Sequence, residues 1–175
     1  STGSNNTMLG KDAGNAGSPG GAVSTGSNQV CIGDENVSAL YCAVDSISTS
    51  DARDKTDVTN FTGGLSWINA MQPVTYRWDK RAWYAKESNP DATPEDILAA
   101  SPDGSKKKDQ LLLGLLAQDI EVIEKANGFA DSADNRLLTD LTEDETSYGL
   151  QYARITPVLI NAIKELSAEI DKLKA

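Results

Sequence analysis

Ser50 and Lys55 are the two residues of this chain whose types and spacing can do covalent chemistry. They place a hydroxyl nucleophile and a potential amine base five residues apart. Lysine serves as the base for a serine in other Ser–Lys arrangements. The pair lies where residues 1–49, rich in Gly, Ser, Asn and Thr, give way to residues 50–175, which have a mixed globular composition. A reactive pair at such a boundary between two regions predicts a chain that cuts itself there.

Lys55 is the natural base because the sequence contains no histidine. A free lysine, with a pKa of about 10.4, is neutral only about one time in a thousand near neutral pH, a deficit of about 4 kcal/mol. Burial and a nearby cation lower a lysine pKa, and Arg53 is the candidate cation. Asp51 and Asp54 act in the opposite direction, and the sequence leaves the balance open.

The composition excludes several classes of function. The 26 acidic and 16 basic residues give a net charge of −10, which argues against general nucleic-acid binding and against anionic membrane surfaces. There is no apolar run of about 18 residues, and no signal peptide is visible. Cys31 and Cys42 form no metal-ligand pattern and are expected to be reduced, so we expect neither a metal nor a cofactor.

The N-terminal region contains a repeat. Residues 1–10 return as residues 24–33, with six of ten positions identical at an offset of 23. Each copy predicts a turn, a short apolar strand and a closing glycine. One such strand cannot bury its apolar side alone, so the missing core has to come from another chain or further repeats. The composition resembles the β-structured stalks of trimeric phage tail fibres and bacterial adhesin heads; the alternative is a flexible linker.

The C-terminal region predicts an α+β fold. Helical spacing and alternation predict two helices and three strands: a helix over 64–71 closed by Pro73, a half-buried strand over 74–78, a buried strand over 111–116, a helix over 117–126 and a strand over 148–152. Residues 85–109 predict a projecting loop or arm that contains a short helix, with Thr93 as N-cap and Pro94 at its first position. The lysine run 106–108 is expected to be a solvated face, or else a contact with an acidic partner.

The last segment, 156–175, predicts a coiled-coil helix. Leu159, Leu166 and Leu173 are seven residues apart, and Ile163 and Ile170 lie between them. Such a short seam is marginal alone, so we expect it to pack against copies of itself. The alternative is a terminal helix docked on its own domain. The seam does not fix the number of chains, and it is the stalk that indicates three.

Four motifs together resemble one known domain. They are the Ser50-Asp51-x-Arg53-x-Lys55 motif, the helix followed by Pro73, Tyr76 and Trp78, the stretch from Gly114 to Asp119, and Tyr152 through Leu166. In this order they resemble the intramolecular chaperone domain that ends many phage tail spikes and fibres, including endosialidases and neck appendages. A related domain occurs in membrane-anchored transcription factors of the myelin regulatory factor type.

The resemblance implies a homotrimer whose C-terminal domain brings three chains into register, folds a stalk of triple β-helix, and then releases itself. It implies cleavage between Thr49 and Ser50, with Ser50 as nucleophile, Lys55 as base, and Asp51 and Arg53 in support. The implied partners are two identical chains and the upstream stalk. The implied location is a virion tail fibre or spike assembled in the host cytoplasm.

Two other interpretations stay open. One is a non-enzymatic trimerisation or receptor-binding tip, in which Ser50 and Lys55 are surface residues. The other is a glycan-binding tip that uses Trp67, Trp78 and Trp83, although the positions of these residues favour core packing.

Overall fold

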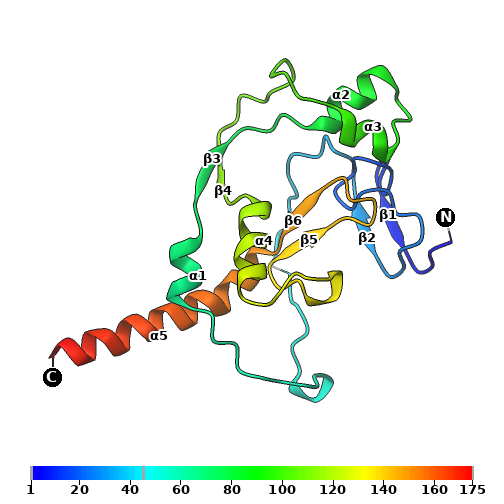
Figure 1. The fold of residues 1–175 in the computed structure, drawn as a ribbon. Helices are drawn as coiled ribbons and strands as arrows, with labels where there is room; N and C mark the ends of the chain where they lie inside the picture. Colours follow the sequence, from blue (N-terminus) through cyan, green and yellow to red (C-terminus); the bar gives the residue numbers. More distant parts are fainter. Residues whose placement is uncertain (1, 45, 175) are drawn as a thin grey trace.

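The computed structural model describes residues 2–44 and 46–174. Ser1 and Ala175, the outer ends of the predicted stalk and C-terminal helix, lie outside the described residues. The fold is α+β, as the sequence predicts. The two copies of the N-terminal repeat lie at one end of the molecule, and the long C-terminal helix points away from the other end (Figure 1).

The two repeat copies stack as parallel strands, β1 (Thr7–Leu9) and β2 (Val30–Ile32). Their register pairs each residue with the one 23 positions later, Thr7 with Val30 and Leu9 with Ile32. The predicted turns stack too, since Asn5 Nδ2 donates to Asn28 Oδ1 at 2.7 Å. This pairing supports a repeat over a flexible linker. The strands nevertheless leave apolar side chains uncovered, with Val30 70% exposed.

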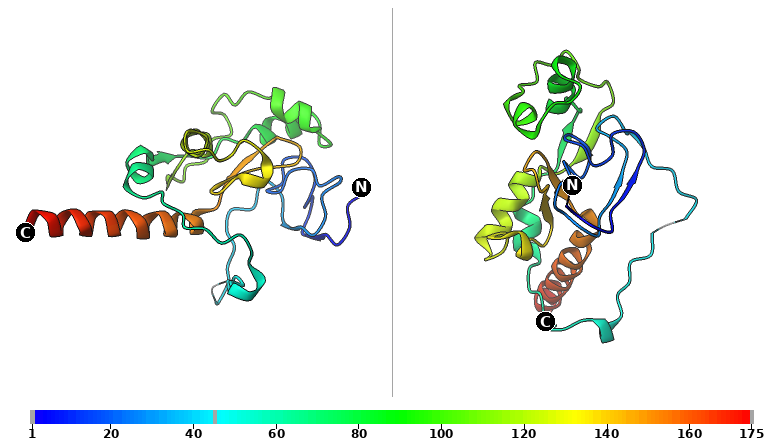
Figure 2. Two further views of the ribbon diagram at one scale, coloured as in Figure 1. Left: turned by 60° about the horizontal axis from the view of Figure 1, so that its bottom comes forward. Right: turned by 90° about the vertical axis from the view of Figure 1, so that its right-hand side faces the viewer.

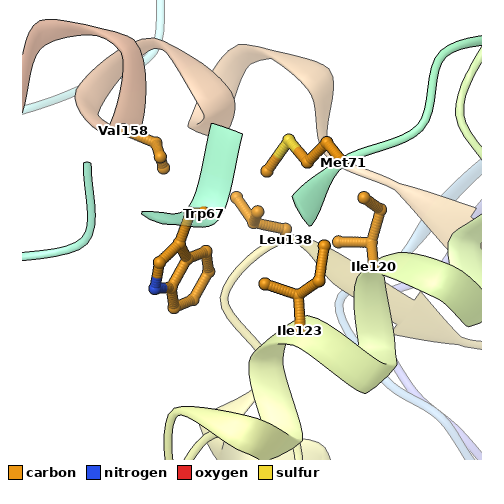
Figure 3. Close-up of a cluster of buried hydrophobic side chains, with 6 residues drawn as sticks. All are labelled: Trp67, Met71, Ile120, Ile123, Leu138 and Val158. Atoms are coloured by element: carbon orange, nitrogen blue, oxygen red, sulfur yellow. The ribbon is translucent and has the colours of Figure 1, made fainter. Parts of the chain in front are cut away.

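The main core lies between three helices: α1 (Leu65–Ala70), α4 (Ala117–Ala126) and α5 (Ile155–Lys174). All three begin and end close to where the sequence predicts. Figure 3 shows the side chains that fill the space between them, which are Trp67, Met71, Ile120, Ile123, Leu138 and Val158. The core prediction for tryptophan is therefore confirmed for Trp67, but it is wrong for Trp78, which is 47% exposed.

An antiparallel ribbon connects this core to an arm. It consists of β3 (Val74–Tyr76) and β4 (Leu112–Gly114), and the arm carries α2 (Arg81–Ser88) and α3 (Pro94–Ala99). The capping box of Thr93 and Asp96 begins α3 as predicted. Two predictions are wrong here. Residues 85–88 are the end of a helix, and β4 is not a buried strand, because Leu113 is 76% exposed beside exposed Leu111.

A hairpin of β5 (Thr139–Leu141) and β6 (Tyr148–Leu150) packs beside α4, and β5 was not predicted. Short 3-10 turns occur at Ala52–Asp54, Ala133–Asn135 and Tyr152–Arg154. The carboxylate of Glu124, completely buried on α4, anchors the start of β5. It accepts hydrogen bonds from the backbone N–H groups of Leu137, Leu138 and Thr139 at 2.6–3.2 Å.

Replacing Glu124 by alanine is expected to lower the free energy of unfolding by about 3 kcal/mol, because three buried N–H donors lose their acceptor. Urea denaturation measures this loss. Gln118→Ala, at an exposed position on the same helix, is the control and is expected to change stability by less than about 0.5 kcal/mol. An equal, small effect of both substitutions would contradict the anchoring role of Glu124.

The C-terminal helix α5 has two distinct faces. Val158 and Ala162 are buried against the domain, which matches the docked-helix alternative for its first half. The predicted seam is exposed along its whole length, and its members Leu159, Ile163, Leu166, Ile170 and Leu173 are 43–87% exposed. One helix thus both packs on its own domain and presents an uncovered apolar stripe.

Candidate active site

The turn that follows Ser50 brings the predicted nucleophile and base together. Asp51 accepts a hydrogen bond from the backbone N–H of Arg53 at 2.9 Å and so begins the 3-10 turn Ala52–Asp54. The turn reverses the chain, and Lys55 Nζ donates to Ser50 Oγ at 2.7 Å. This is the contact through which a neutral amine would take the hydroxyl proton.

Asp51 and Arg53 form an ion pair beside this contact. The Arg53 guanidinium donates Nη2–H to Asp51 Oδ2 at 2.6 Å and Nε–H to both carboxylate oxygens. These hydrogen bonds hold the pKa of Asp51 below its usual value. The guanidinium is therefore engaged by the carboxylate next to it. Arg53, the candidate cation for Lys55, therefore fixes the shape of the turn instead.

The whole segment around the pair is exposed in the single chain. Each described residue from 36 to 60 is exposed, and in that part of the chain no hydrogen bond or ion pair of residues 38–60 reaches outside the segment. Figure 2 shows the segment looping away from the body of the molecule. It also carries large apolar side chains in water, with Ile47 96% exposed. Among residues 2–44 and 46–174, nothing shields Lys55 from solvent.

Comparison with known proteins identifies the segment that begins at Ser50. Residues 50–129 match the model of the peptidase S74 family, described as chaperone of endosialidase, which is a little under half of the chain. This segment is therefore similar to the chaperone-of-endosialidase family. The resemblance inferred from the sequence is thereby confirmed for this segment. No curated protein and no solved structure shows significant similarity to the chain.

The C-terminal region contacts the repeat region through the turn between β5 and β6. Glu143 accepts hydrogen bonds from the backbone N–H groups of Thr25 and Gly26 at 3.1 and 2.9 Å. Asp144 accepts one from the backbone N–H of Ala22 at 2.5 Å. A side chain at Gly21 would collide with Asp144. Two carboxylates of the domain therefore replace the water that would otherwise solvate this turn of the repeat.

The arm makes a second contact with the repeat region, and its helices lie beside β1 and β2 in Figure 1. Lys86 on α2 forms a buried ion pair with Glu35 at 2.7 Å, and Lys80 donates to the Glu35 carbonyl oxygen at 2.7 Å. A small apolar cluster joins the same two regions, made of Ala16 with Ala82, Ala85, Ala92 and Ile97. The insert 85–109 is thus an arm, as predicted, whose tip packs on the repeat.

These two contacts were missed by reasoning from the sequence. Glu143 is 118 residues away from Thr25 along the chain, so no local pattern connects them. The only local signal is the composition of the turn 142–146, in which threonines flank acidic residues. The apolar cluster between the arm and the repeat consists mostly of alanines, and these small side chains do not give helix α2 a recognisable apolar face in the sequence.

The carboxylate contact has a predictable pH dependence. Hydrogen bonds from Thr25 and Gly26 hold the pKa of Glu143 below its usual 4.5. For Asp144, burial opposes ionisation, but the hydrogen bond from Ala22, with those from Thr142 and Thr146, outweighs it and holds the pKa below 3.8. Because both native pKa values are lowered, the contact is complete above these ordinary values and is lost as the pH falls through the lowered ones.

Replacing Glu143 by alanine is expected to speed amide hydrogen exchange at Thr25 and Gly26 about tenfold at neutral pH. The same acceleration is expected in the unaltered chain when the pH is lowered through the depressed pKa of Glu143, after correction for intrinsic exchange. Glu145→Ala, at an exposed neighbour for which no such contact exists among the described residues, is the control. Equal exchange in all three proteins would contradict the contact.

Metal clusters and membrane-spanning helices are both absent from the described residues. Within residues 2–44 and 46–174, no group of three or more His, Cys, Asp or Glu side chains is placed to hold a metal ion. In the same part of the chain, no helix has the length and apolarity needed to cross a membrane.

Proposed function

We propose that this chain is part of a phage tail fibre or spike. Residues 1–49 are the end of the stalk, and residues 50–175 are an intramolecular chaperone that trimerises and folds it. The chaperone then separates itself by cutting between Thr49 and Ser50. The observation that supports this most is that the family match begins at Ser50, whose hydroxyl is in contact with the Lys55 amine.

The chaperone part of the proposal draws on the contacts between the domain and the repeat. A stalk turn whose backbone N–H groups are already bound by Glu143 and Asp144 loses less conformational entropy when the next rung stacks on it. The arm holds the stalk from a second direction through the Lys86–Glu35 ion pair. Two fixed contacts would set the position of each chain's stalk relative to its chaperone domain, and three associated domains would set the register.

The trimer part draws on apolar surface that one chain leaves in water. Such surface occurs on β1 and β2, on the segment before Ser50 and along the seam of α5. Large contiguous apolar patches on a single chain mark interaction sites. Two identical chains would cover all three regions at once, since symmetric copies present the same patches to one another.

The cleavage would proceed as an acyl shift followed by hydrolysis. The Ser50 hydroxyl oxygen attacks the carbonyl carbon of Thr49 while Lys55 Nζ takes the hydroxyl proton. The Thr49–Ser50 C–N bond then breaks, the proton passes to the leaving nitrogen, and an ester joins Thr49 to the Ser50 oxygen. Water hydrolyses this ester. One cut with a half-life of about an hour requires a barrier of only about 22 kcal/mol.

Denaturing electrophoresis of the full chain against Ser50→Ala tests the proposal. Self-cleavage is expected to yield fragments of 49 and 126 residues (175 − 49) from the wild type alone. Mass spectrometry of the fragments locates the cut. An intact wild type that still forms trimers would instead favour a non-enzymatic trimerisation tip, the interpretation that the exposure of Ser50 and Lys55 supports.

A further inference from the structure

The segment that carries Ser50 and Lys55 joins two held regions. On its N-terminal side, Glu35 of the repeat region pairs with Lys86 of the arm, and on its C-terminal side the chain reaches the core at Phe61, six residues after Lys55. Residues 38–60 make no hydrogen bond or ion pair beyond the segment within the described chain. The first anchored side chain is Phe61, whose ring packs at 5.2 Å from that of Trp67. The position of the reactive pair relative to the domain therefore depends most on how the nearer end, residues 61–65, is held.

Two side chains of α5 hold these residues. Asn161 Nδ2 donates to the carbonyl oxygens of Phe61 and Gly63 at 2.8 and 3.1 Å, which uses both of its amide hydrogens. Glu165 Oε2 accepts a hydrogen bond from the backbone N–H of Leu65 at 2.8 Å. The first turn of α1 has no capping side chain of its own, so Glu165 supplies the missing acceptor from another helix.

The fit at this contact is close. A side chain at Gly64 would collide with the Glu165 carboxylate. A carboxylate near the N-terminus of a helix is also favoured by the dipole of the peptide groups. Asn161 and Glu165 lie on the face of α5 that holds buried Val158 and Ala162, about 100° round the helix from the exposed seam. One face of α5 therefore presents the exposed seam, and the neighbouring face holds the end of the reactive segment.

We propose that Asn161 and Glu165 are positioning residues that couple assembly of the α5 seam to self-cleavage at Ser50. The inference rests on the proposed function. When copies pack on the seam, α5 becomes a fixed support, and its two polar side chains hold the Phe61–Leu65 end of the reactive segment against it. The segment then lies against the neighbouring chains, where Lys55 can be shielded from water. Without these side chains the helices still associate, but the segment is not held.

The test compares Glu165→Ala, Glu165→Gln and Asn161→Asp in the full chain. Glu165→Ala removes the acceptor for the Leu65 N–H, and Asn161→Asp removes both donors at nearly unchanged shape. Each is expected to slow formation of the two fragments at least tenfold. Glu165→Gln keeps an acceptor oxygen and is expected to cleave within about threefold of the wild type. Glu169→Ala is the matched control. Glu169 is exposed one turn further along α5, and its side chain makes no hydrogen bond or ion pair with the described residues.

Assembly is measured separately, by light scattering and circular dichroism of the same variants combined with Ser50→Ala. Mass and helix content are expected to be unchanged. Slower cleavage that follows lost assembly would overturn the inference, because the two residues would then act on folding. Wild-type cleavage rates in Glu165→Ala and Asn161→Asp would overturn it too, while leaving the proposed function intact.

Amide exchange of residues 50–60 in the assembled Ser50→Ala chain gives a readout that does not depend on cleavage. Glu165→Ala is expected to raise it at least tenfold above Glu169→Ala. Equal exchange would overturn the inference even if the wild type cleaves. An intact wild type would refute the proposed self-cleavage, and exchange would then still decide whether Asn161 and Glu165 hold the segment.

Discussion

Lys55→Met is expected to slow cleavage of the Thr49–Ser50 bond by about 10²–10⁴-fold, because it removes the general base and keeps a side chain of similar length. The only amine in contact with the Ser50 hydroxyl among the described residues is that of Lys55, at 2.7 Å. No histidine exists in the chain to take over its role. Fragment formation on denaturing gels, quantified over time, measures the rate.

The control is Lys107→Met, which removes the charge of an exposed lysine in the same domain. It is expected to cleave like the wild type. A wild-type rate in Lys55→Met would remove the dyad from the mechanism and leave Ser50 with another base or none.

Local features of the fold are predictable from the sequence because local physics decides them. The repeat offset fixes the register of β1 on β2, since identical turns stack on each other. Asn127-Gly128 ends α4 where a left-handed residue is needed, and Gly128 has a φ of 82°. The Ser50–Lys55 contact belongs to this class, since a turn of three residues is enough to close it.

Features that depend on distant partners were missed. Helix α2 has no apolar stripe, and it buries Ala82 and Ala85 against Ala16 of the repeat region, with which periodicity does not connect it. The apolar run around Leu113 reads as a buried strand, yet this residue faces water. An apolar run indicates that the segment packs against another apolar surface. It does not indicate whether that surface belongs to the same chain or to another one.

The environment of the candidate site is one of the features that depend on distant partners. Sequence and fold bring Ser50 and Lys55 together, but the chain alone leaves both in solvent. The chemistry requires a neutral amine, which burial favours. The exposed apolar side chains on the same segment, such as Ile47, are therefore as much a part of the site as the dyad. Under the proposed function, they are the surface through which other chains would remove the dyad from water.

Ile163→Ser is expected to abolish stable trimers at micromolar concentration. Ile163 lies in the middle of the α5 seam and is 65% exposed in the single chain. Fully burying an isoleucine side chain contributes about 1.5–3 kcal/mol, and assembly can bury only the exposed part of Ile163, so its loss from three helices removes roughly 3–6 kcal/mol from the assembly. This weakens association by more than about a hundredfold. Light scattering of the Ser50→Ala background measures the mass without interference from cleavage.

Lys164→Ser is the matched control, because it places the same residue one position further along the helix, at an exposed site off the seam. Its helix-propensity cost is no smaller than that of Ile163→Ser, because lysine favours the helix more than isoleucine does, and it should still leave the trimer intact. If self-cleavage requires assembly, Ile163→Ser chains also stay uncut while Lys164→Ser chains are cut. Efficient cleavage of monomeric Ile163→Ser would separate the two processes, and the Ser50–Lys55 pair would then act without the shielding that neighbouring chains supply.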